Sequence, residues 1–142
     1  MLKKYLAAAL MLSTAACSGG SSEPTDAATT ESSAATEANF QLAIACQANL
    51  DAVGRIYSVL ATQETGAEQE KMAALTKARE QAAAAYREQA KKVGAELGHP
   101  EAEIAAAIKA SDDYVKAEFE KREFGDFATW VASQADGCPP PA

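Results

Sequence analysis

The sequence predicts an all-α fold, a small bundle of three longer helices followed by one short C-terminal helix. From about residue 39 onward, apolar side chains recur every three or four positions, which is the period of an amphipathic helix. The chain has no strand-like alternation, no cluster of β-branched residues and no internal repeat. Alanine, which has the highest helix propensity, is abundant throughout. Short connections between such helices favour antiparallel neighbours.

The first predicted helix begins near Asn39, a suitable N-cap, and ends in the polar stretch 62–66. Its apolar stripe consists of Leu42, Cys46, Leu50, Val53, Tyr57 and Leu60. These positions advance by three or four residues and therefore share one face of a helix. We expect that face to be buried.

The second predicted helix covers residues 67–97. Its apolar stripe consists of Met72, Leu75, Ala82, Tyr86, Val93 and Leu97. Four consecutive alanines at 82–85 lie in its middle, and side chains this small allow another helix to approach closely. Gly98 is expected to end the helix, and Pro100 suits the first turn of the next.

The third and fourth predicted helices follow at 100–121 and after Gly125. The third carries Ile104, Ile108, Val115 and Phe119 on one stripe, with Asp112, Lys116 and Glu120 on an opposite face that we expect to be solvated. Asp126 is expected to cap the short fourth helix, which bears Phe127, Trp130 and Val131. Three prolines at 139–141 cannot continue a helix and close the chain.

Composition limits both the size of the core and the class of partner. The 142 residues fit one domain with appendages, and aromatic residues make up only 6%, so we expect a thin core. Residues 1–16 contain two lysines and no acid, which leaves 20 acidic and 11 basic residues from Cys17 onward, a net charge of −9. This charge repels phosphate groups, so a nucleic-acid partner is not expected.

The N-terminus has the three-part organisation of an export signal. Lys3 and Lys4 precede an apolar stretch at 5–12, which is followed by small residues at 13–16. The apolar stretch is too short to span a bilayer. The segment Thr14-Ala15-Ala16-Cys17 is similar to a lipobox, with threonine where leucine is usual. The chain thus resembles a Gram-negative bacterial lipoprotein precursor. The alternative is an ordinary signal peptide cleaved nearby, which would leave a soluble periplasmic protein.

This resemblance implies that residues 1–16 are removed and that Cys17 becomes the acylated, palmitate-bearing first residue. In the family, aspartate directly after that cysteine favours the inner membrane. Ser18 and Gly19 stand there instead, which implies an outer-membrane lipoprotein facing the periplasm. Residues 17–38 are rich in Ser, Thr, Ala and isolated acids, so we expect a disordered linker there and the folded domain at 39–142.

The three cysteines fit this location. Lipidation of Cys17 would leave Cys46 and Cys138 as a pair in a compartment where disulfides persist. We therefore predict a Cys46–Cys138 disulfide. The alternative is two separate free thiols, because no spacing rule fixes so distant a pair.

The side chains that could support catalysis are few. His99, the only histidine, lies between a glycine and a proline, where we expect an exposed turn residue, and a single histidine excludes a His-based metal cluster. Haem-binding CxxCH, thioredoxin-like CxxC, phosphate-binding glycine loops and calcium loops are not found. The carboxylate pairs Asp112–Asp113 and Glu101–Glu103 point in different directions on a helix. We therefore expect neither an enzyme nor a metal or other cofactor.

One local concentration of large rings stands out. It comprises Tyr114, Phe119, Phe124, Phe127 and Trp130. These rings are either a candidate ligand or partner patch or ordinary core packing at one end of the bundle. The expected function is that of a non-enzymatic interaction or scaffold lipoprotein that binds an envelope protein. The alternatives are a carrier of small apolar ligands and an inhibitor of an envelope-directed hydrolase.

Overall fold

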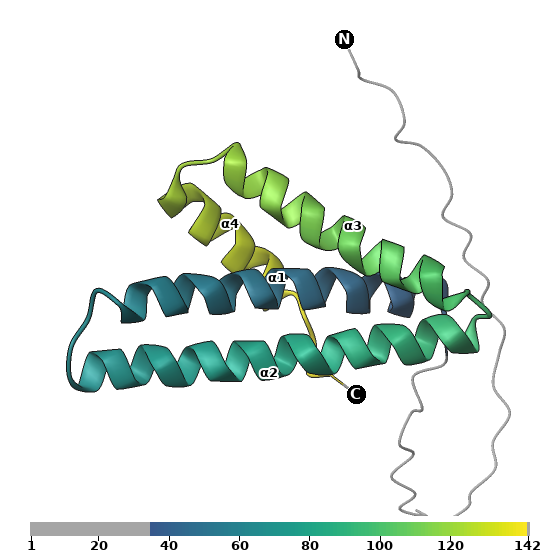
Figure 1. Ribbon diagram of the computed structural model, residues 1–142, viewed down its shortest axis with the longest axis horizontal. Coiled ribbons are helices and arrows are strands. Elements are labelled where there is room, and N and C mark those ends of the chain that lie inside the picture. Colours follow the sequence, from purple (N-terminus) through teal and green to yellow (C-terminus); the bar gives the residue numbers. More distant parts are fainter. Residues whose placement is uncertain (1–34, 142) are drawn as a thin grey trace, which may run out of the picture. The chain divides into compact units, whose positions relative to one another are not determined.

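The structure, a computed structural model, describes residues 35–141. In this part of the chain there are four helices and no strand: α1 (Glu37–Ala61), α2 (Ala67–Glu96), α3 (Glu101–Glu120) and α4 (Phe124–Asp136). Helices α1 and α2 lie side by side as an antiparallel hairpin, α3 runs back from the α2–α3 turn, and α4 folds down onto the middle of α1 (Figure 1). The predicted all-α class, with three longer helices and a short fourth, is confirmed.

Helix α1 begins two residues before the predicted start at Asn39. Thr36 is the N-cap, because its hydroxyl accepts a hydrogen bond from the backbone N–H of Asn39 at 3.2 Å. The earlier start brings Phe40 into the first turns of the helix, where it is 3% exposed. The folded domain therefore includes residues that we assigned to the linker 17–38.

Helix α1 is the centre of the bundle, since each of the other three helices packs against it. It consequently buries a wide arc that includes Phe40, Ala43, Ile44 and Gln47. Leu42, which the helical stripe predicted to be buried, lies outside this arc and is 40% exposed. A single-stripe pattern describes a helix with one neighbour and is too narrow for a central helix.

The core is thin and rich in alanine, as the composition predicts. Its buried apolar members are Phe40, Ala43, Ile44, Cys46, Ala48, Leu50, Val53, Ala83, Tyr86, Ala90, Val93, Ile104, Ile108, Val115, Phe127, Val131 and Ala135. Gly94 of α2 is also buried, and a Cβ atom there would lie 2.8 Å from Ile104 and 2.9 Å from Phe40. Residues of α1 and α3 therefore approach α2 closely at a position that has no side chain.

The C-terminal segment is fixed to the hairpin by two bonds. Cys46 of α1 and Cys138 form a disulfide with a Cα–Cα distance of 5.7 Å, which confirms the predicted pairing. The hydroxyl of Tyr86 in α2 donates a hydrogen bond to the carbonyl of Pro139. Burial raises the pKa of Tyr86, so the hydroxyl keeps the proton that it donates. The segment after α4 is thus connected to both long helices.

The starts of the two shorter helices differ in detail from the predictions. Pro100 is the N-cap of α3 rather than part of its first turn. Helix α4 begins at Phe124, with Glu123 as its N-cap, so Asp126 lies inside the first turn and does not cap it. A carboxylate in the first turn still interacts favourably with the positive end of the helix dipole.

Candidate functional site

The predicted lipidation site, Cys17, lies outside the described residues, as do the export signal and nearly all of the linker. Its acylation therefore stays a prediction. None of the helices in the described range 35–141 is long and apolar enough to cross a membrane.

Four of the five rings of the predicted aromatic patch form a continuous chain on α3 and α4. Phe127 is its centre, with ring centroids 5.1 Å from Phe119 and 5.8 Å from Trp130. Tyr114 continues the chain in an edge-on contact with Trp130 at 6.2 Å. Edge-on and tilted arrangements at these distances are favourable for aromatic pairs.

The same rings divide between core and surface. Phe127 is 5% exposed and belongs to the core, whereas Tyr114, Phe119 and Phe124 are 58%, 47% and 45% exposed. Phe127 therefore belongs to the core packing, and a ligand or partner patch formed by the exposed rings stays a prediction. The three exposed rings are the ones available to a ligand or partner.

Phe119 and Phe124 line a half-open groove between α1, α3 and α4, with a volume of about 390 Å³. Its apolar lining consists of Ala52, Ile56 and Val59 from α1, Val115 and Phe119 from α3, and Phe124 and Phe127 from α4. We call this the α1–α3–α4 groove. The α3 and α4 side of this groove was predicted from the aromatic residues, whereas its α1 side was not, because Ile56 and Val59 lie between the stripe positions expected there.

Charged side chains border the α1–α3–α4 groove, and most of them are paired. Arg55 binds Asp51 at 2.8 Å on α1, and Lys109 binds Asp113 at 2.5 Å on α3. Lys116, which is exposed, has no ion-pair partner within residues 35–141. The groove therefore combines an apolar lining with one uncompensated positive charge at its edge.

The α3–α4 turn behind the groove is held by a nearly buried carboxylate. Glu118 is 8% exposed and accepts hydrogen bonds from Lys121 at 2.8 Å and Arg122 at 2.5 Å. These bonds, that of Lys121 foremost, lower the pKa of Glu118. Arg122 also lies 4.9 Å above the ring of Trp130, in a cation–π contact. The predictions missed this cluster, although a glutamate followed at three and four positions by Lys and Arg is its sequence signal.

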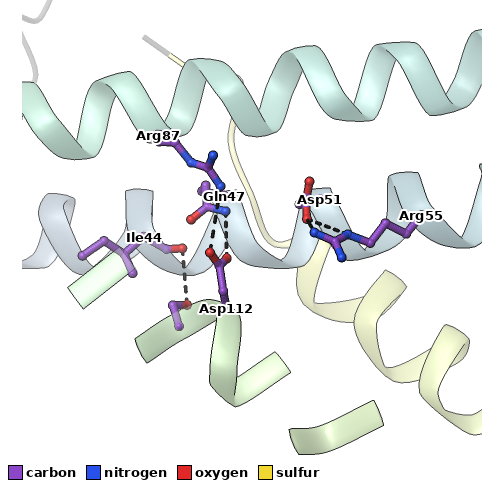
Figure 2. Close-up of polar contacts among 7 residues, drawn as sticks. Ile44, Gln47, Asp51, Arg55, Arg87 and Asp112 are labelled. Atoms are coloured by element: carbon purple, nitrogen blue, oxygen red, sulfur yellow. Dashed lines mark hydrogen bonds and ion pairs between the residues drawn. The ribbon is translucent and has the colours of Figure 1, made fainter. Parts of the chain in front are cut away.

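A polar group joins three helices beside the groove. Gln47 of α1 is fully buried, and its amide donates a hydrogen bond to Asp112 of α3 at 2.9 Å. Arg87 of α2 lies 3.9 Å from the other oxygen of the same carboxylate (Figure 2). Asp112 was predicted to lie on a solvated face; its side chain is 41% exposed, but it also bonds to α1 and α2. Asp113 binds Lys109 and does not face Asp112. The pair does not have the shared geometry of an acid–base couple.

His99 was predicted to be an exposed turn residue, and this prediction is wrong, because its side chain is packed. Its ring stacks on Phe40 with centroids 5.0 Å apart, and its side chain is 25% exposed. The two ring nitrogens face Glu37 at 3.1 Å and Glu103 at 3.5 Å. Hydrogen bonds from Gln41 and then from His99 lower the pKa of Glu37. The cluster ties the start of α1 to the α2–α3 turn.

A second groove, of about 600 Å³, lies between α2 and α3. Lys91 and Lys109 on its edge are already paired with Glu88 and Asp113, at 2.8 and 2.5 Å. Its floor is formed by the buried Ile104 and Ile108 rather than by exposed rings. The α1–α3–α4 groove is therefore the stronger candidate for a binding site.

Among the described residues, no group of three or more His, Cys, Asp or Glu side chains is placed to hold a metal ion. Comparison of the chain with family models, with curated proteins and with solved structures gave no match. The candidate site therefore has to be interpreted from its own geometry.

Proposed function

We propose that this protein is a lipid-anchored lipoprotein of the cell envelope that binds a protein partner through the α1–α3–α4 groove and catalyses no reaction. The observation that carries the binding proposal is the exposure of Phe119 and Phe124, close to one half each, at the mouth of an apolar groove. Large exposed apolar side chains gathered in a concave surface are typical of interaction sites. Aromatic side chains are also the residues that most often dominate binding energy.

The location belongs to the same proposal. The export signal and the lipobox at Cys17 support anchoring at the outer membrane, facing the periplasm. About twenty residues separate Cys17 from the first helix, and a disordered linker of that length, as its composition predicts, would average roughly 25 Å from end to end. A bundle held in this way presents its groove to neighbouring envelope proteins.

The test of binding compares two variants in pull-downs of the full-length protein from intact, crosslinked envelopes. We expect the double variant Phe119→Ala/Phe124→Ala to recover at least about tenfold less partner, the loss typical of central aromatic contacts. The matched control is Leu42→Ala, which removes a similarly exposed apolar side chain from α1 outside the groove. Equal recovery with both variants, each with unchanged thermal unfolding, would contradict the proposal.

A small apolar ligand is a second candidate, favoured by the size of the groove. Its volume of about 390 Å³ is within the range of small-molecule sites, and Phe127 connects it to Trp130. A carrier would change Trp130 fluorescence when palmitate is titrated into the full-length protein, and the Phe119→Ala/Phe124→Ala variant would not. Unchanged fluorescence in the wild-type protein rules out a fatty-acid carrier and leaves the protein-binding proposal in place.

A further inference from the structure

We propose that the α1–α3–α4 groove binds an amphipathic helix of a partner protein, about two turns long at the contact, with an acidic residue opposite Lys116. This inference rests on the proposed function and specifies the chemistry of the partner. It follows from the shape of the groove walls, from their backbone hydrogen bonding and from the charge at the groove edge.

The long walls of the groove are two helix faces. On α1 the apolar positions are Ala52, Ile56 and Val59, spaced by four and three residues, and on α3 they are Val115 and Phe119, spaced by four. Seven residues of helix extend about 10 Å, which is two turns. Faces with this spacing form ridges and grooves that a third helix can fill.

The backbone of these walls favours a helix over an extended peptide. The wall residues lie within α1 and α3, so their N–H and C=O groups are used inside those helices. An extended peptide would find no backbone partners along the walls, unlike a peptide added to the edge of a sheet. A helix satisfies its own backbone and needs only to present apolar side chains.

The charge at the edge specifies one further feature of the partner. Arg55 is paired with Asp51, and Asp113 with Lys109, whereas Lys116 has no ion-pair partner in the described chain. A helix seated between the walls would therefore be complementary if it carried a glutamate or aspartate beside its apolar stripe. The contribution is modest, as for other exposed ion pairs, and mainly selects register and orientation.

The experiment replaces Phe124, and separately Leu42 as the control, by the photo-crosslinker p-benzoylphenylalanine in the full-length protein in living cells. We expect crosslinks from position 124 to one protein. A third variant carries the same crosslinker at Val59, and mass spectrometry should find the partner residues that crosslink to positions 59 and 124 spaced by three, four or seven. Crosslinks at alternate residues, or to an acyl lipid, would overturn the helix proposal. Crosslinking from 124 no stronger than from 42 would overturn the proposed function as well.

A second measurement tests the role of Lys116 once that segment is known. Binding of a synthetic peptide of the crosslinked segment is compared for the wild-type protein, Lys116→Glu and Lys116→Arg. We expect about fivefold weaker binding for Lys116→Glu, no change for Lys116→Arg, and recovery when the facing acid of the peptide is changed to lysine. Equal affinity for all three proteins would overturn the charge assignment.

Discussion

Glu118 illustrates how one residue determines local structure near the groove. It lies at the C-terminal end of α3, where a negative charge is unfavourable to the helix dipole, and it is only 8% exposed. Lys121 and Arg122 compensate for both effects through hydrogen bonds. Arg122 also contacts the ring of Trp130, so the carboxylate is connected to the aromatic patch through one side chain.

The lowered pKa of Glu118 predicts a pH-dependent contribution to stability. The folded state favours the charged carboxylate, so the stabilisation is present above the ordinary pKa of 4.5 and is lost as the pH falls through the lowered value. In urea unfolding at neutral pH and below pH 4.5, we expect Glu118→Gln to be less stable than wild type at neutral pH and to lose less on acidification. Glu120→Gln, an exposed neighbour, is the control and should behave like wild type. If both variants titrate alike, Glu118 has no such role.

The close packing around Gly94 predicts that a side chain at this position destabilises the fold. A methyl group at this position would lie 2.8 Å from Ile104, so we expect Gly94→Ala to lower the free energy of unfolding by about 1 to 3 kcal/mol. Gly125→Ala is the matched control, because nothing lies within 4 Å of a Cβ there and alanine favours a helix. Chemical unfolding of both variants checks the prediction, and equal stabilities would show that the helices separate easily at Gly94.

At the scale of elements, local pattern predicted the helices well and their packing poorly. Periodicity located all four helices, and Gly66 and Gly98 marked turns, because these signals are local; Gly125, which was expected to precede the fourth helix, lies inside α4. The burial of Phe40 and the hydrogen bond between Gln47 and Asp112 depend on which helices meet, and a sequence of one chain does not contain that information directly. The α1 half of the groove was not predicted for the same reason. Ile56 and Val59 become part of a groove only where α3 and α4 pack beside α1.

The disulfide that joins α1 to the segment after α4 predicts that its reduction strongly lowers the free energy of unfolding. The disulfide closes a loop with a sequence separation of 92, so the double variant Cys46→Ser/Cys138→Ser is expected to lose about 2 to 5 kcal/mol of stability. Denaturant unfolding of the wild-type protein with and without reductant should reproduce this difference. An unchanged midpoint in both experiments would mean that the hydrogen bond from Tyr86 to Pro139 and core packing are sufficient to hold the segment.

For the whole molecule, the main prediction concerns its attachment to the membrane. With a net charge of −9 from Cys17 onward, the protein is not expected to adhere to anionic lipid electrostatically, so attachment should depend on the acylated cysteine. We expect Cys17→Ser to abolish labelling by radioactive palmitate and to move the protein from the membrane to the soluble fraction. Unchanged membrane association of the variant would contradict the lipoprotein assignment, and a soluble wild-type protein would favour an ordinary signal peptide.

The position of the disulfide also determines how the protein would respond to mechanical force. Every lining residue of the α1–α3–α4 groove, from Asp51 to Phe127, lies inside the covalent loop between Cys46 and Cys138. A pull applied at Glu37 while a partner holds the groove would first act on the nine residues of α1 that precede Cys46. From Cys46 onward the force would be shared between the backbone and the disulfide to Cys138. A bound partner would therefore stay in the groove after the first two turns of α1 had unfolded.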